Sequence, residues 1–290
     1  MKIIFIGGLV NGKLIVEHIL KNKEISLPLI FTHPLNFKIQ SYDNFNKFTK
    51  KTKIIRNINV NKHYGQIKSI NPDLIIVAGW SWLISEKILK LPRLGTVGFH
   101  PSLLPKDRGR SVLAWQIEEG YTETALSMFY ITKGVDDGDI IAQNKIKILK
   151  SDTIKNILNK CNIETSKQIK KYLPLILKGQ APRRKQNKKL STYRPLRTDE
   201  NSIIDWNKNK KFIYNKIRAI SDPYPGAFFI NKRRKIYVKK GIIVNNKVIL
   251  KVAHKYNSGE IVKLYNSKDC IIKCANGLIR VKTTNEIKKN

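Results

Sequence analysis

Cysteine, acidic residues and long apolar runs are all scarce in this chain of 290 residues. The three cysteines, Cys161, Cys270 and Cys274, are too few and too odd in number for a disulfide framework, which favours a reducing compartment. No uninterrupted apolar run approaches the roughly 20 residues that span a bilayer, and the apolar opening is too short for a signal peptide. We therefore expect a cytoplasmic protein with no membrane partner.

Two sequence patterns of ligand binding are also missing. Cys270 and Cys274 have no further cysteine or nearby histidine to complete a set of metal ligands, so no metal is expected. Gly7 and Gly8 follow the first apolar run, but the next glycine is Gly12, so the dinucleotide pattern G-x-G-x-x-G is not met. Such a glycine pair is more often a tight turn, and NAD is not expected.

Positive charge is what the chain has in excess. It carries 56 basic and 21 acidic residues, a net charge of +35, with 34 basic and 9 acidic residues in positions 151–290. Such a field favours polyanionic partners. An A/T-rich coding sequence would produce the same abundance of Lys, Ile and Asn whatever the function, and the basic clusters 183–185 and 232–235 lack interleaved aromatic residues. Nucleic acid therefore stays an open alternative.

The first half of the sequence has the pattern of an α/β protein. Strand-like segments at 3–6, 29–32, 74–78 and 96–100 alternate with helical spacing, as at 13–20, and further apolar runs cover 125–131 and 140–148. Ser111 is expected to cap a helix over 112–119 that ends at Gly120, and Ser151 to open another. These features predict a Rossmann-like, mostly parallel sheet flanked by helices.

The second half has a different pattern. Residues 178–189 are expected to form an exposed linker, and short strand-like segments follow Pro225-Gly226. They lie at 227–230, 235–238, 242–252, 260–264, 270–274 and 278–281. This spacing predicts a small antiparallel β-barrel of the OB type. We therefore predict a main domain over 1–182, a linker and connecting helix over 183–225, and a small C-terminal domain over 226–290.

Two segments have the residue types of an active site. His100 ends a predicted strand and is followed by a loop that Pro101, Pro105 and Gly109 stiffen. Open α/β sheets bind ligands at such carboxyl ends. The acidic turn 134–139 lacks the ligand spacing of a calcium loop. It is either a hairpin turn with solvated aspartates or the source of a carboxylate, Asp136, that orients the imidazole and takes up a proton.

These segments resemble the folate-dependent formyltransferases, which include methionyl-tRNA formyltransferases and nucleotide-sugar N-formyltransferases. The resemblance lies in Phe99-His100-Pro101-Ser102-Leu103-Leu104-Pro105, in Arg108-Gly109 and in the acidic turn 134–139. Residues 78–85 resemble the segment that packs on the pterin, and 204–206, 217–219 and 223–228 resemble the carboxyl-terminal region of the tRNA and sugar enzymes. The resemblance implies formyl transfer from N10-formyltetrahydrofolate to an amine.

The resemblance also assigns roles to residues. His100 would stabilise the oxyanion or relay a proton, while Asp136 would keep the imidazole charged and accept the proton of the amine. Trp82, Leu83 and Ile84, together with Val135, would bind the folate. For the aromatic residues of this segment, core packing is the alternative reading.

One position departs from the family pattern Asn-x-His, because Gly98 stands where the family has the asparagine. An oxyanion donor is typically worth ~3 kcal/mol, or about a hundredfold or more in rate. Gly98 and His100 lie on one face of the strand, so we expect the glycine to leave a gap wide enough for a water.

The acceptor is expected to be a nucleotide-linked amino sugar. Residues 31–35 continue without the basic insertion of the tRNA enzymes, and both this segment and Arg108-Gly109-Arg110-Ser111 resemble the sugar enzymes. The first alternative is a methionyl-tRNA formyltransferase. The second is a catalytically impaired formyltransferase-like protein that binds a nucleotide or RNA through its basic half. Homodimer formation is left open.

Overall fold

The computed structural model describes residues 1–35 and 45–287, and the chain separates into two compact units. Unit 1 comprises residues 1–109, 124–146 and 159–193, and unit 2 comprises 110–123, 147–158 and 194–290. The chain therefore enters unit 2 twice before the C-terminal region begins. Within the described ranges, no helix is both long and apolar enough to cross a membrane.

Unit 1 is built on a mixed sheet with the strand order β3-β2-β1-β4-β5-β7-β8. The first five strands of this order, β3, β2, β1, β4 and β5, are parallel, and β7 runs antiparallel to β5. The strands are β1 (Lys2–Gly7), β2 (Ser26–Thr32), β3 (Lys53–Arg56), β4 (Leu74–Ala78), β5 (Thr96–His100), β7 (Glu123–Tyr130) and β8 (Ile140–Lys147). Most of these strands are rich in Ile and Val and are buried on both faces. This is typical of parallel strands that are covered by helices on both sides.

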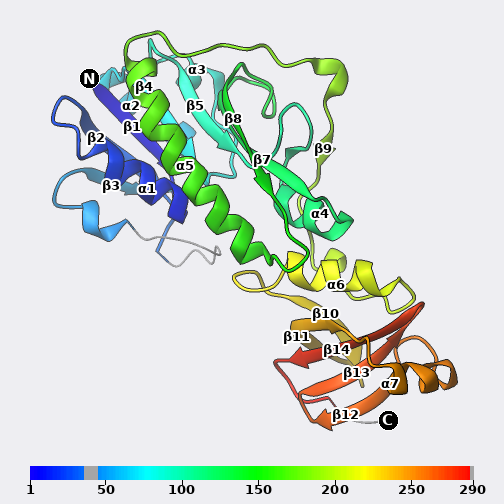
Figure 1. The fold of residues 1–290 in the computed structure, drawn as a ribbon. Helices are drawn as coiled ribbons and strands as arrows, with labels where there is room; N and C mark the ends of the chain where they lie inside the picture. Colours follow the sequence, from blue (N-terminus) through cyan, green and yellow to red (C-terminus); the bar gives the residue numbers. More distant parts are fainter. Residues whose placement is uncertain (36–44, 288–290) are drawn as a thin grey trace. The chain divides into compact units, whose positions relative to one another are not determined.

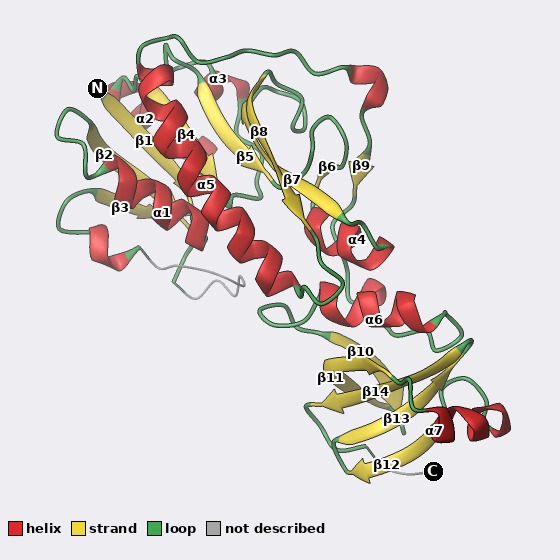
Figure 2. Ribbon diagram, viewed as in Figure 1, coloured by secondary structure: helices red, strands yellow, loops and turns green. Residues whose placement is uncertain are grey.

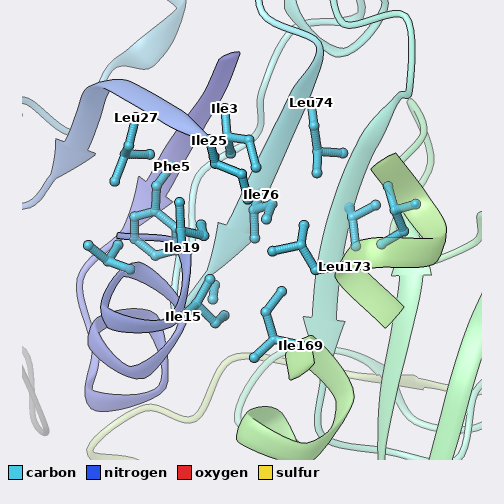
Figure 3. Close-up of a cluster of buried hydrophobic side chains, with 14 of the residues drawn as sticks. Ile3, Phe5, Ile15, Ile19, Ile25, Leu27, Leu74, Ile76, Ile169 and Leu173 are labelled. Carbon is cyan, nitrogen blue, oxygen red and sulfur yellow. The ribbon is translucent and has the colours of Figure 1, made fainter. Parts of the chain in front are cut away.

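Alternate residues of these strands belong to two apolar cores, one on each face of the sheet. On one face, helices α1 (Val10–Ile19) and α5 (Ile154–Leu177) cover the sheet (Figure 1). Ile3, Phe5 and Ile76 of the sheet belong to the core on this face. Figure 3 shows Ile15 and Ile19 of α1 with Ile169 and Leu173 of α5 in this cluster. On the other face, helices α2 (Tyr64–Ile70) and α3 (Glu86–Leu89) contribute one buried isoleucine each to a second cluster. The sheet is thereby packed on both faces.

Unit 2 contains helices and an antiparallel sheet (Figure 2). The sheet has the order β10-β11-β14-β13-β12, from β10 (Ala227–Asn231), β11 (Arg234–Ile243), β12 (Ile261–Asn266), β13 (Asp269–Cys274) and β14 (Gly277–Thr283). Helix α4 (Val112–Glu119) packs against α6 (Lys210–Ala219). The buried carboxylate of Glu118 on α4 forms ion pairs with Arg197 and, at 3.3 Å, with Lys216 of α6. Two cations thus neutralise a charge that would be costly alone.

The predicted fold class is confirmed, as a mostly parallel sheet with helices is followed by an antiparallel sheet. Three local predictions are wrong. Ser151 does not open the next helix, because α5 begins only at Ile154. Ser111 does not cap α4 with its side chain; its backbone is left-handed, and Ser111 Oγ instead accepts from the Arg197 N–H at 3.2 Å. The segment predicted as a strand over 242–252 turns into helix α7 (Lys247–Val252), because the Asn246 side chain caps the N–H groups of Val248 and Ile249.

Candidate active site

The candidate site lies at the edge where strands β1, β2, β4 and β5 end. Strand β1 lies between β2 and β4 in the sheet. The chain runs from β1 to β2 and β3 on one side and then returns to β4 on the other side of β1, so the direction of the strand order reverses between β1 and β4. Open α/β sheets bind ligands at such a point. A Cβ on Gly7 would overlap with the carbonyl of Ala78, and one on Gly8 with the ring of His33. The Gly7-Gly8 pair therefore permits close packing of strand ends.

His100 and Asp136 meet at this edge. His100 is the last residue of β5 and is 5% exposed, while Asp136 belongs to the turn between β7 and β8. His100 Nδ1 lies 3.3 Å from Asp136 Oδ2, and His100 Nε2 lies 2.7 Å from the main-chain oxygen of Asp107. Each ring nitrogen therefore has an oxygen beside it, and the two oxygens fix the orientation of the imidazole.

Main-chain geometry fixes the carboxylate in this pair. The Gly109 N–H donates to the same Asp136 Oδ2 at 2.8 Å. Asp107, Gly109 and Asp136 have φ angles of 54°, 103° and 49°, in the left-handed region. For the two aspartates this conformation is strained, at roughly 1–3 kcal/mol each. Strain of this kind gathers where side chains must be held in one orientation, as for a group that moves a proton.

Gln186 and Arg108 are connected to this pair by hydrogen bonds, and neither was among the predicted site residues. Gln186 Nε2 donates to Asp136 O at 2.8 Å and to Gly138 O at 2.7 Å, and Gln186 Oε1 accepts from Arg108 Nη2 at 2.7 Å. The segment predicted as an exposed linker is thus bonded to the acidic turn, and Arg184 also pairs with Ile140 through two main-chain bonds. Most residues of this segment are polar or basic, so nothing local signals this docking.

The predicted folate-binding segment follows β4. Trp82 and Trp80 form an aromatic group with His33, with ring centroids 5.0–5.3 Å apart. Burial lowers the pKa of His33 to about 4, so the ring is neutral near pH 7. The side chain of Leu83 is exposed, and its main-chain oxygen accepts from Asn61 at 3.1 Å. This segment is therefore anchored through its backbone while one apolar side chain faces solvent.

The remaining predicted site residues differ in burial. Ile84 packs on the apolar cluster under α2 and α3, as a structural residue would, whereas Val135 is 46% exposed beside Asp136. The structure thus brings His100 and Asp136 into contact and joins Trp82 to an aromatic group. Binding of folate by Trp82, Leu83, Ile84 and Val135 stays a prediction.

The gap expected at Gly98 is filled. An ideal Cβ on Gly98 would lie 2.7 Å from Cδ1 and 2.9 Å from Cγ1 of Ile131, the residue that follows β7. Carbon atoms pack at about 3.5–4.0 Å, so the isoleucine occupies the space next to the glycine. The expectation of a water there is wrong, because the apolar side chain of Ile131, directly after β7, takes its place.

Fold and site together define an α/β protein with a histidine–carboxylate pair at the carboxyl edge of its sheet. Residues 1–173 match the formyl transferase family and residues 197–290 match its C-terminal domain. The chain belongs to the formyl transferase family, which confirms the resemblance seen in its motifs. The two family matches and the two compact units divide the chain differently, and boundaries at 182 and 225 stay a prediction.

The relatives of this chain include proteins of two kinds. The bifunctional polymyxin resistance protein ArnA of Wigglesworthia glossinidia brevipalpis is 37% identical over 188 residues, covering 65% of this chain and 29% of ArnA. A methionyl-tRNA formyltransferase of Ruminiclostridium cellulolyticum is 32% identical over 217 residues, covering 75% and 68%. Another, from Desulforamulus reducens, is covered over 57% of its length. The chain thus matches less than two thirds of the length of several relatives.

Solved structures show the same fold along nearly the whole chain. A sugar 3N-formyl transferase, WlaRD, studied with dTDP and 5-N-formyl-THF, has a TM-score of 0.71 and 20% identity, with 99% of each chain covered. An N-formyltransferase of Helicobacter canadensis, in complex with folinic acid and dTDP-3-aminofucose, has a TM-score of 0.72 and 19% identity, with 98% and 99% covered. At these identities the likeness concerns the fold alone.

Proposed function

We propose that this protein transfers a formyl group from N10-formyltetrahydrofolate to the amine of a nucleotide-linked amino sugar. The observation that carries the proposal is the contact of His100 with Asp136 at the carboxyl edge of the sheet, 3.3 Å apart in a strained and hydrogen-bonded frame. Family membership supports a formyl-transferring enzyme. The amine nitrogen bonds to the formyl carbon, the bond from that carbon to N10 breaks, and the proton lost by the amine is balanced by one gained at N10.

Asp136 is the proton acceptor in this proposal. Its side chain is 21% exposed, against 7% for that of His100, so an incoming amine reaches the carboxylate first. His100 is aligned by the carboxylate, and contact with the oxyanion requires His100 Nε2 to exchange its bond to Asp107 O for the substrate oxygen. The two residues divide the work, with Asp136 receiving the proton and His100 stabilising developing negative charge.

The aromatic group after β4 fits a pterin. Trp80 Nε1 is buried and, among the described residues, has no hydrogen-bond partner. A buried donor of this kind gains from an acceptor on a ligand. Trp82 and the exposed Leu83 add apolar surface beside it, and the main chain there is held by Asn61. We propose that this segment binds the folate.

Two observations bear on the acceptor. The structures related along the full chain include the sugar 3N-formyl transferase and the enzyme with dTDP-3-aminofucose, which supports a sugar acceptor. The second candidate is methionyl-tRNA, favoured by the net charge of +35 and by the relative that is 32% identical. Binding of a polyanion by surface charge weakens steeply with salt, whereas recognition of a small nucleotide sugar weakens less.

Mass spectrometry of the products distinguishes the candidates. The purified protein is incubated with N10-formyltetrahydrofolate and, in separate arms, with dTDP- or UDP-linked amino sugars or with initiator methionyl-tRNA at two salt concentrations. Asp136→Asn serves as the control for catalysis. The proposal predicts a formylated sugar in the wild type and its loss in the variant. Formylation of tRNA alone would overturn the sugar proposal, and folate binding without transfer to any acceptor would support the non-catalytic alternative.

A further inference from the structure

The side chain of Gln186 can be oriented in one way only. Arg108 Nη2 donates to it, and the main-chain oxygens of Asp136 and Gly138 accept from it. A guanidinium has no acceptor and a carbonyl has no donor, so the oxygen of the amide faces Arg108 and the nitrogen faces the two carbonyls. All polar atoms of this amide are in use, in a stretch between the two family matches, which end at 173 and resume at 197.

The bonds from Gln186 act on the conformation of Asp136. With a φ of 49°, Asp136 occupies a region that non-glycine residues seldom adopt. Its main-chain oxygen and that of Gly138 are pinned by one amide nitrogen, which clamps the turn on both sides of Asp137. This clamp fixes the direction in which the Asp136 carboxylate leaves the backbone, toward His100 Nδ1 and the Gly109 N–H.

Arg108 gives the clamp a fixed base. It is 2% exposed, and its Nη1 donates to the Tyr193 hydroxyl at 3.0 Å. Its main-chain N–H donates to Thr192 O at 2.8 Å, beside the pairing of β6 (Arg108–Gly109) with β9 (Tyr193–Arg194). The Asp107 N–H also donates to Thr192 Oγ1. Gln186 therefore bonds the loop after His100 to the turn that carries Asp136.

We propose that Gln186 is a positioning residue for Asp136, held in place by Arg108, and that it sets the orientation of the carboxylate without contacting the substrate. This inference rests on the proposed function for its effect on rate, but the clamp itself can be tested without turnover. A misplacement of about 1 Å at a reacting group can lower the rate about a hundredfold.

Two substitutions of Gln186 test the clamp by kinetics. Gln186→Ala removes every bond of the amide, and Gln186→Glu keeps an acceptor for Arg108 but turns a second oxygen toward the two carbonyls. We expect kcat to fall about 10- to 100-fold in Gln186→Ala, and at least as far in Gln186→Glu, with KM changed less than about threefold. The matched control is Gln180→Ala, because Gln180 is exposed in the same segment. Wild-type kcat in Gln186→Glu would overturn the proposal.

Amide hydrogen exchange tests the clamp independently of activity. The Gly109 N–H is bonded to the Asp136 carboxylate, whereas the Ile140 N–H is bonded to Arg184 O and reports whether the segment stays docked. In Gln186→Ala we expect exchange at Gly109 to quicken about tenfold while Ile140 keeps its protection. Unchanged exchange at Gly109, or equal acceleration at both amides, would overturn the proposal by showing no effect on Asp136 or a general loss of docking.

The two measurements separate the two proposals. If the wild type forms no formylated product with any acceptor, the proposed function fails. The amide exchange rates at Gly109 and Ile140 then decide by themselves whether Gln186 positions Asp136. If the wild type is active and either Gln186 variant retains its kcat, the clamp is overturned while the proposed function stands.

Discussion

The packing of Ile131 against Gly98 predicts the outcome of restoring an asparagine at position 98. A side chain there must push Ile131 Cδ1 from 2.7 Å out to at least about 3.5 Å, a shift close to 1 Å at the end of a half-buried side chain. Such overpacking costs about 1–3 kcal/mol. At about 2–4 °C per kcal/mol for a chain of this size, Gly98→Asn should lower Tm by about 2–12 °C.

The companion variant is Gly98→Asn combined with Ile131→Ala, which removes both atoms that crowd position 98. The double variant should be more stable than the sum of the single changes predicts, with a coupling energy of about 0.5–3 kcal/mol. It also leaves an amide on the same face of β5 as His100, so kcat should exceed that of Ile131→Ala about tenfold or more.

Thermal unfolding by circular dichroism and formyl transfer by chromatography measure the two effects in all four proteins of the cycle. A Gly98→Asn protein as stable as the wild type would refute the argument that Ile131 fills this space. Additive stabilities would do the same. A kcat in the double variant no higher than in Ile131→Ala would show that the amide does not reach the reacting atoms.

Three further variants test other features of the structure. Asp136→Asn should lower kcat by about 10²–10⁴-fold with Tm almost unchanged, because its side chain is partly exposed; an active variant would remove Asp136 from the mechanism. Burial lowers the pKa of His33 to about 4, so the neutral ring contributes fully to the free energy of unfolding above pH 6.5. This contribution should fall by up to about 3 kcal/mol as the pH drops toward 4. His18, whose pKa burial also lowers, acts in the same direction, and His33→Gln should flatten the curve measured by urea unfolding; an unchanged slope contradicts the assignment. Asn246→Ala should cost about 1 kcal/mol and speed amide exchange within α7, whereas unchanged exchange would mean that the cap is not needed.

The sequence predicts those features whose cause is local. Runs such as Leu74–Ala78 are apolar and β-branched enough to be buried strands, and each strand placed at 3–6, 29–32, 74–78 and 96–100 lies within an observed strand. Gly120 ends its helix because glycine adopts the left-handed conformation, here with a φ of 81°, at little cost. The contact of His100 with Asp136 was also expected, since both follow strands of one sheet.

One local feature and two features that depend on distant partners were missed. The apolar content of residues 242–252 favours a strand, but the Asn246 side chain bonds to two N–H groups and starts a helix there. Gln186 has no local sign of function, because its partners are main-chain oxygens of Asp136 and Gly138. Ile131 could not be matched with Gly98 before the antiparallel pairing of β5 with β7 was known.

The charge of Glu118 has a consequence for how this chain can change in evolution. Glu118 is encoded in the first half of the chain, whereas its partners Arg197 and Lys216 are encoded beyond the first family region. A C-terminal region that packed on α4 without cations at positions 197 and 216 would leave the Glu118 carboxylate buried and unpaired. An unpaired buried charge destabilises a protein by about 3–5 kcal/mol. Exchange of the C-terminal region by recombination would therefore destabilise the chain unless the donor supplies equivalent cations at positions 197 and 216.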